Sequence, residues 1–163
     1  MKIKFITTGG TIDKVYFDDK SEYEVGPPQI IEILRDVHAT IEFEVESVLR
    51  KDSLDLTDAD RQLICERVEA DPCPRIIVTH GTDTMVQTAQ VLQRIAGKTI
   101  VLTGSMQPAR FRVTDAVFNI GMAIGAVQAL PPGVYLAMNG RIFDPNRTRK
   151  SREKNCFEEC EPA

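Results

Sequence analysis

Short apolar runs alternate with segments of helical periodicity along most of this chain. Apolar runs rich in β-branched residues favour buried strands, whereas apolar residues spaced three and four apart favour helices. We expect strands at residues 2–8, 41–46, 75–79, 98–103 and 134–138. We expect helices at residues 29–37, 57–70, 82–96 and 114–130. This alternation predicts an α/β fold with a mainly parallel sheet.

Several segments also predict local features of the fold. Residues 41–46 alternate apolar and polar side chains, which predicts a strand with one face in water. Thr57 and Thr114 are candidate N-caps, because each precedes a helical pattern. The stretch 13–28 is long, polar and charged, so we expect a mobile loop there. The residues after 138 are mainly polar, and no element is assigned to them.

Composition narrows the class of protein. The chain has 163 residues, 42% of them apolar and 27% charged, which suits one globular domain spanning residues 1–163. No apolar run approaches the roughly 20 residues that a membrane-spanning helix needs. Twenty basic against 24 acidic side chains give a net charge of -4, which disfavours a nucleic-acid partner. The opening residues contain no long apolar stretch, so we expect a cytoplasmic protein with reduced cysteines.

Polar residues suited to chemistry follow the expected strands. In an open parallel sheet the carboxyl ends of the strands share one edge, and ligands bind outside that edge. The segments that follow the strands are residues 8–11, 51–53, 80–84, 104–106 and 139–150. Hydroxyls, carboxylates and a lysine recur in them, which predicts a pocket for a small polar ligand.

Gly9 and Gly10 precede Thr11 at the end of the first expected strand. Glycines let the backbone approach a ligand closely and turn its amide groups inward. Thr11 is therefore a candidate nucleophile beside an oxyanion hole. A strand-ending turn, in which the threonine only satisfies backbone groups, explains the same residues.

Thr82 and Asp83 follow His80 and a glycine at the start of the clearest helical pattern. They predict either an N-terminal cap or a ligand contact in which Asp83 receives a substrate ammonium. His80 and His38 are interpreted as structural, and the four cysteines offer too few ligands for zinc, so no metal site is predicted. Basic residues between 141 and 152 are typical of a solvated face, unless one lysine folds back over the pocket.

Two segments resemble the signature motifs of the bacterial-type L-asparaginase/glutaminase family. They are Ile6-Thr7-Thr8-Gly9-Gly10-Thr11-Ile12 and Val78-Thr79-His80-Gly81-Thr82-Asp83-Thr84-Met85. Residues 51–55, 101–108 and 137–144 resemble further segments of that family, and the last of them leads to Lys150. The resemblance covers nearly the whole chain. It implies the three-layer αβα fold, with a mainly parallel sheet, of the family's N-terminal domain.

The resemblance also implies a nucleophile and an activating group. Thr11 would attack the side-chain amide of the substrate, helped by a tyrosine of the expected loop. Tyr23 matches the family pattern best, and Tyr16 is a rival because it lies closer in sequence. Thr82 is a second hydroxyl in the same pocket and stays an alternative nucleophile.

By the same resemblance, Thr82, Asp83 and Lys150 would form a second triad. In it Lys150 polarises Thr82, and Asp83 also holds the substrate amino group. Asp52 and Ser53 would bind the backbone end of the substrate. The residues that would contact the substrate are Gly10, Asp52, Ser53, Gly81, Thr82, Asp83 and Ser105. No metal or organic cofactor is implied.

Family members usually have about twice this length. Their second, smaller domain often contributes an acidic residue to the active site of a neighbouring subunit. This chain ends soon after Lys150, so we expect a short form or a fragment, and a short form would replace that acidic residue from its own loop or tail. We expect a homodimer or homotetramer, with the helix at 114–130 as a candidate interface.

The activity implied is hydrolysis of L-asparagine to L-aspartate and ammonia through a threonine acyl-enzyme, with low affinity. One alternative is a module that binds asparagine or aspartate without hydrolysing it. Another is a glutaminase or a related amidohydrolase. The preference between asparagine and glutamine stays open, because one methylene is worth only roughly 1–3 kcal/mol of discrimination.

Overall fold

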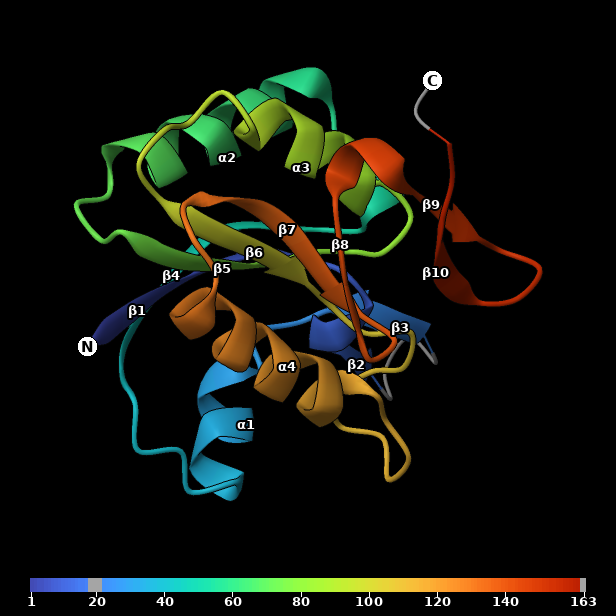
Figure 1. Cartoon of the computed structure of the whole chain (residues 1–163). Helices are drawn as coiled ribbons and strands as arrows, with labels where there is room; N and C mark the ends of the chain where they lie inside the picture. The colour runs from blue at the N-terminus through green and yellow to red at the C-terminus, as the bar shows by residue number, and fades with distance from the viewer. Residues whose placement is uncertain (18–21, 162–163) are drawn as a thin grey trace.

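A six-stranded sheet forms the centre of the computed structural model, which describes residues 1–17 and 22–161 (Figure 1). The strands lie in the order β4 (Glu42–Lys51), β1 (Lys2–Gly9), β5 (Arg75–Thr79), β6 (Thr99–Thr103), β7 (Gly133–Met138) and β8 (Arg141–Phe143). Neighbouring strands are parallel except β7 and β8, which are antiparallel. The expected mainly parallel sheet is confirmed.

Helices cover both faces of this sheet and make three layers (Figure 1). One face carries α2 (Asp58–Ala70) and α3 (Met85–Leu92), and the other carries α1 (Ile30–Asp36) and α4 (Ala116–Ala129). Successive side chains of the central strands point to opposite faces of the sheet. Ile6 and Val78 belong to the core under α2 and α3, whereas Phe5 and Ile77 belong to the core over α1 and α4. Burial on both faces explains why these strands appear as continuous apolar runs.

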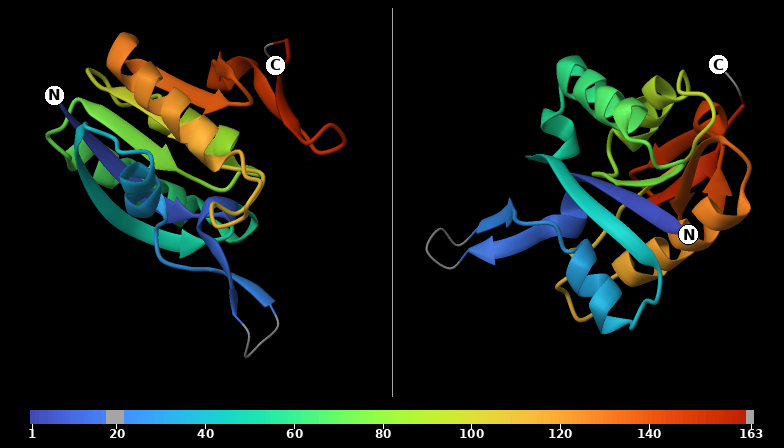
Figure 2. Two further views of the ribbon diagram at one scale, coloured as in Figure 1. Left: turned by 90° about the horizontal axis from the view of Figure 1, so that it is seen from below. Right: turned by 90° about the vertical axis from the view of Figure 1, so that its left-hand side faces the viewer.

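Two antiparallel hairpins lie outside the central sheet. β2 (Lys14–Phe17) pairs with β3 (Glu22–Val25), and β9 (Thr148–Ser151) pairs with β10 (Cys156–Glu159). The β2–β3 hairpin projects from the body of the molecule (Figure 2). The expected loop at 13–28 therefore contains two strands, with residues 18–21 outside the described residues, and the residues after 138, to which no element was assigned, form β8, β9 and β10. Short strands that pair mainly with each other lack the long apolar runs by which buried strands are recognised.

α3 is shorter than the predicted 82–96 at both ends. Its N-cap residue is Thr84, which makes no side-chain capping bond. The Thr84 hydroxyl instead donates to the Ser53 carbonyl oxygen at 2.7 Å. Thr82 and Asp83 therefore precede the helix as a turn and do not cap it, because their side chains bond elsewhere.

Among the helices, α2 has the N-terminus that the sequence indicates most clearly. Thr57 Oγ1 accepts from the Asp60 N–H at 3.2 Å, and Asp60 Oδ2 accepts from the Thr57 N–H at 2.9 Å, which is a reciprocal capping box. The N-cap of α4 is Asp115, one residue after the expected Thr114, whose hydroxyl accepts from the Ala116 N–H at 3.1 Å. Within the part of the chain that the structure describes, no helix is long and apolar enough to cross a membrane.

Candidate active site

The turn after β1 and the turn after β5 meet at the carboxyl edge of the sheet. Gly10 has a φ of 88°, a left-handed conformation that favours glycine. A Cβ on Gly10 would lie 2.4 Å from the Gly81 nitrogen, so the two backbones leave no room for a side chain. Thr11 follows at once and is half-buried. The structure therefore brings the segments of Thr11 and Thr82 together.

The turn after β4 joins the same edge. A Cβ on Gly81 would lie 2.6 Å from Ser53 Oγ, and the buried Ser53 hydroxyl has no hydrogen-bond partner among the described residues. Asp52 accepts from the Leu54 N–H at 3.1 Å and pairs with Lys14 Nζ at 2.8 Å. Burial raises the pKa of the Asp52 carboxyl, but the Lys14 and Leu54 contacts outweigh burial and hold it below its usual value.

Lys150 reaches this edge from the β9–β10 hairpin. Its Nζ donates to Thr82 Oγ1 at 2.7 Å and to Asp83 Oδ1 at 2.9 Å. The hairpin is anchored by Phe157, whose side chain is buried and whose N–H donates to Asn139 Oδ1 at 2.9 Å. The Lys150 and Asp83 side chains are only 13% and 25% exposed. Thr82, Asp83 and Lys150 thus form one contiguous polar cluster.

Arg152 is a further cation at this cluster, and the sequence analysis does not single it out. Its Nε lies 3.5 Å from Asp83 Oδ1, the oxygen that also accepts from Lys150. The Arg152 side chain is 72% exposed. The spacing of two residues from Lys150 is a signal that could have found it, because such residues lie on one side of an extended segment.

The two candidate tyrosines face each other across the β2–β3 hairpin. Tyr16 is the register partner of Tyr23, and their ring centroids are 5.3 Å apart. Tyr23 also packs edge-on against Phe111 at 5.6 Å. Both tyrosines are about half exposed, and among the described residues neither hydroxyl bonds to Thr11. The geometry therefore leaves both tyrosines as candidates.

Two other polar residues in the segments that follow the strands make hydrogen bonds to groups of the protein itself. Ser105 is buried, and its hydroxyl donates to the Gln107 carbonyl oxygen within its own loop. His80 is fully buried, with Nδ1 2.7 Å from the Gly81 carbonyl oxygen and Nε2 2.8 Å from Thr88 Oγ1. Burial lowers the pKa of His80 to about 4, so the imidazole is neutral. These contacts favour structural roles for both side chains.

Asp13 is a buried carboxyl that the sequence analysis missed. It lies two residues after Thr11, and only 3% of it is exposed. Its Oδ1 accepts from the Gln29 N–H at 2.8 Å, and its carbonyl oxygen accepts from the Gly26 N–H at 2.8 Å. Burial raises the pKa of Asp13 to about 7. These bonds tie the base of the β2–β3 hairpin to the Thr11 turn, and no sequence pattern distinguishes this aspartate from exposed ones.

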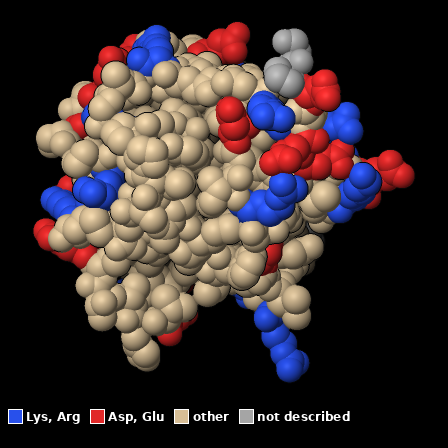
Figure 3. Space-filling model, viewed as in Figure 1, with Lys and Arg blue, Asp and Glu red and all other residues tan. Residues whose placement is uncertain are grey.

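A hollow of about 370 Å³ borders the cluster on the side of α3. Its lining includes Asp83, Gln87, Gln90, Lys150 and Arg152. Charged side chains of both signs gather over the adjoining β9–β10 hairpin, whereas the middle of the same view is largely uncharged (Figure 3). Within residues 1–17 and 22–161, no three His, Cys, Asp or Glu side chains lie close enough to hold a metal ion.

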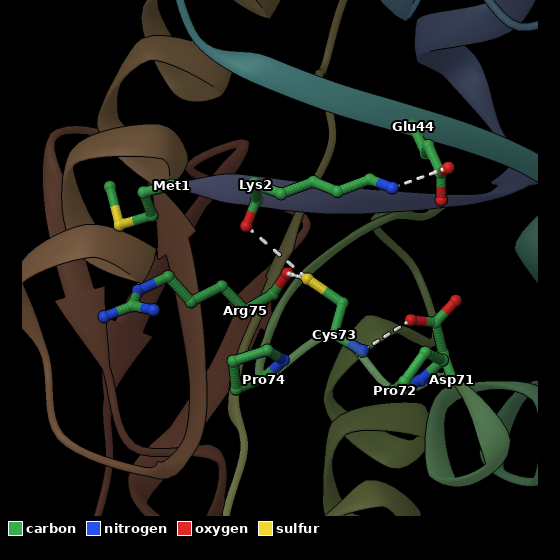
Figure 4. Close-up of a pocket in the computed structure, with 8 residues that line it drawn as sticks. All are labelled: Met1, Lys2, Glu44, Asp71, Pro72, Cys73, Pro74 and Arg75. Carbon is green, nitrogen blue, oxygen red and sulfur yellow. Dashed lines mark hydrogen bonds and ion pairs between the residues drawn. The ribbon is translucent and has the colours of Figure 1, made fainter.

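A second hollow, of about 510 Å³, lies where β1 and β5 begin (Figure 4). Lys2, Glu44 and Arg75 line it, together with Cys73, whose Sγ lies 3.2 Å from the Arg75 carbonyl oxygen. This is the opposite edge of the sheet from Thr11. The hollow is therefore separate from the candidate active site.

A sequence model of the family described as "Asparaginase, N-terminal" matches residues 2–161. The chain therefore belongs to this family. The L-asparaginase of Thermococcus kodakarensis is 32% identical over 158 residues, which cover 92% of this chain and 48% of that relative.

Solved structures agree with this assignment. The thermostable L-asparaginase from Thermococcus kodakarensis aligns with a TM-score of 0.84 at 29% identity, covering 98% of this chain and 51% of that one. The probable cytoplasmic L-asparaginase from Campylobacter jejuni aligns with a TM-score of 0.83 at 25% identity, covering 97% and 53%. The chain spans about half the length of these relatives, and its αβα fold is shared with them.

Proposed function

We propose that this chain carries the catalytic centre of an L-asparaginase, which hydrolyses L-asparagine to L-aspartate and ammonia. The observation that carries the proposal is the cluster of Lys150, Thr82 and Asp83 beside the Gly10–Thr11 turn. Family membership and the names of the relatives support it. The reaction is acyl transfer to water, so it needs a nucleophile, a proton carrier and groups that orient the substrate.

Thr11 is the nucleophile in this proposal. Its hydroxyl oxygen attacks the carboxamide carbon, and its proton is relayed toward the amide nitrogen through the hydroxyl of Tyr23 or, as the rival, of Tyr16. The tetrahedral intermediate collapses, the C–N bond breaks, and the nitrogen takes up that proton and leaves as ammonia. Water then hydrolyses the threonine ester and releases aspartate.

The second cluster orients and polarises the substrate. Because the Lys150 ammonium donates to Thr82 Oγ1, the Thr82 proton is left to point toward the substrate. Lys150 approaches Asp83 through Oδ1, which leaves Oδ2 for the α-ammonium. The unpartnered Ser53 hydroxyl would donate to the α-carboxylate, and Asp52 would hold the turn that presents it.

Three further predictions belong to this proposal. We expect low affinity for asparagine, a cytoplasmic location and a homodimer or homotetramer. The location agrees with the name of the Campylobacter jejuni relative.

The exposed side of α4 supports an interface between subunits, since α4 has no charged residue and its Val117 and Phe118 are 43% and 61% exposed. Sedimentation of wild type and Phe118→Glu tests the interface: a monomer at all concentrations contradicts it.

Ammonia release from L-asparagine tests the proposal when wild type is compared with Thr11→Ala. We expect the variant to lose at least about 1,000-fold in kcat while its circular dichroism is unchanged. Thr40→Ala is the matched control, because Thr40 is exposed and precedes β4 at the other end of the sheet. Full activity in Thr11→Ala would contradict the assignment of the nucleophile. A folded wild type that binds asparagine without releasing ammonia would identify a binding module.

A further inference from the structure

Two cations approach the same oxygen of Asp83. Lys150 Nζ lies 2.9 Å from Oδ1 and is only 13% exposed, so it is a fixed part of the cluster. Arg152 Nε lies 3.5 Å from the same oxygen but is 72% exposed, so water competes for it. Arg152 is therefore the displaceable partner of Asp83.

The other cations of the β9–β10 hairpin have partners of their own. Arg149 pairs with Glu158 at 2.7 Å, and Lys154 pairs with the same carboxylate at 3.0 Å. Within the described part of the chain, Asp83 is the acidic partner of Arg152. Because Lys150 pairs with the same carboxylate, two cations share one negative charge, and Arg152 adds a net positive charge at the mouth of the 370 Å³ hollow, which it lines.

We propose that Arg152 is a specificity-determining residue that places a second positive charge at Oδ1 of Asp83, beside the oxygen left for a substrate ammonium. This inference rests on the proposed function, in which Asp83 receives the α-ammonium of asparagine. An ammonium that binds Oδ2 then lies beside the guanidinium at Oδ1 as a like charge. At a separation of about 5 Å in a partly exposed site, that repulsion weakens binding by a factor of about three to ten.

A substrate without an ammonium avoids this penalty. Succinamate has the carboxamide, the carboxylate and the chain length of asparagine, and lacks only the amino group. It leaves the Arg152–Asp83 pair in place, and its carboxylate is attracted by the guanidinium. Arg152 therefore shifts the preference of the site from amino-acid amides toward monoamides of dicarboxylic acids.

The test is steady-state kinetics on both substrates with wild type, Arg152→Gln and Lys154→Gln. We expect Arg152→Gln to lower the KM for L-asparagine about fivefold with little change in kcat, while the KM for succinamate stays constant or rises. Lys154→Gln is the matched control, because it removes one positive charge from the same hairpin, at an exposed residue that pairs with Glu158 and does not line the hollow. An equal change for both substrates, or the same change in the control, would overturn the proposal.

A binding measurement distinguishes a failure of this inference from a failure of the proposed function. If wild type hydrolyses neither substrate, calorimetry with the same two ligands replaces the kinetics. Tighter asparagine binding in Arg152→Gln with unchanged succinamate binding then supports the role of Arg152, although the proposed hydrolysis has failed. Unchanged affinities for both ligands overturn the inference, and absence of any binding overturns both proposals.

Discussion

Replacing Asp13 by asparagine should remove a pH dependence of stability that burial builds into this fold. Burial raises the pKa of Asp13 from 3.8 to about 7, although the Gln29 N–H and the Arg50 charge act in the opposite direction. An acid with a raised folded pKa ionises more easily in the unfolded chain. Its contribution to stability is therefore fully present below pH 3.8 and is lost as the pH rises to about 7. The difference between the unfolded and folded pKa of Asp13 corresponds to about 4 kcal/mol in the free energy of unfolding.

Urea unfolding at pH 5 and pH 8 measures this effect. Over this range we expect the free energy of unfolding of wild type to fall by about 2–3 kcal/mol more than that of Asp13→Asn. The asparagine keeps an oxygen for the Gln29 N–H, so the hydrogen bond at 2.8 Å is preserved. Asp55→Asn removes an exposed carboxylate and should follow wild type at both pH values. Parallel behaviour of wild type and Asp13→Asn would refute the reasoning.

Three further predictions concern the candidate active site. Gly10→Ala should lower the free energy of unfolding by more than about 2 kcal/mol, because its Cβ would meet the Gly81 nitrogen at 2.4 Å. Gly97→Ala, at a φ of 76° with open space around it, isolates the backbone part of that cost in the same urea assay. Lys150→Met should lower kcat by at least about 100-fold in the ammonia assay, and Lys150→Arg should restore part of the activity. An unchanged kcat in Lys150→Met would show that the lysine has only a structural role. Tyr23→Phe should lower kcat by at least about 100-fold and Tyr16→Phe should not, and the reverse order would assign the activation to Tyr16.

The central sheet could be predicted from the sequence because its strands are buried on both faces. Ile76, Ile77 and Val78 form one uninterrupted apolar run, and the structure distributes them to opposite faces. The N-cap at Thr57 was equally recognisable, since the cap and the helix that it begins are adjacent in sequence. Such local or strongly apolar signals need no knowledge of the tertiary structure.

Contacts between distant segments account for the errors. The start of α3 was misplaced because Thr82 bonds to Lys150 and Thr84 bonds to Ser53, and neither partner is local in sequence. The hairpins were missed because pairing between short polar strands leaves little trace in hydropathy. Asp13 and Arg152 were missed because burial and ion pairing depend on what the fold places beside a charged side chain.

The most direct test of the account is an NMR time course of L-asparagine mixed with the wild-type chain. We expect conversion to L-aspartate with one equivalent of ammonium released, and no conversion by Thr11→Ala at the same concentration. Unchanged asparagine over hours, in the presence of a chain that circular dichroism shows to be folded, would contradict the claim that these residues form a competent amidohydrolase site.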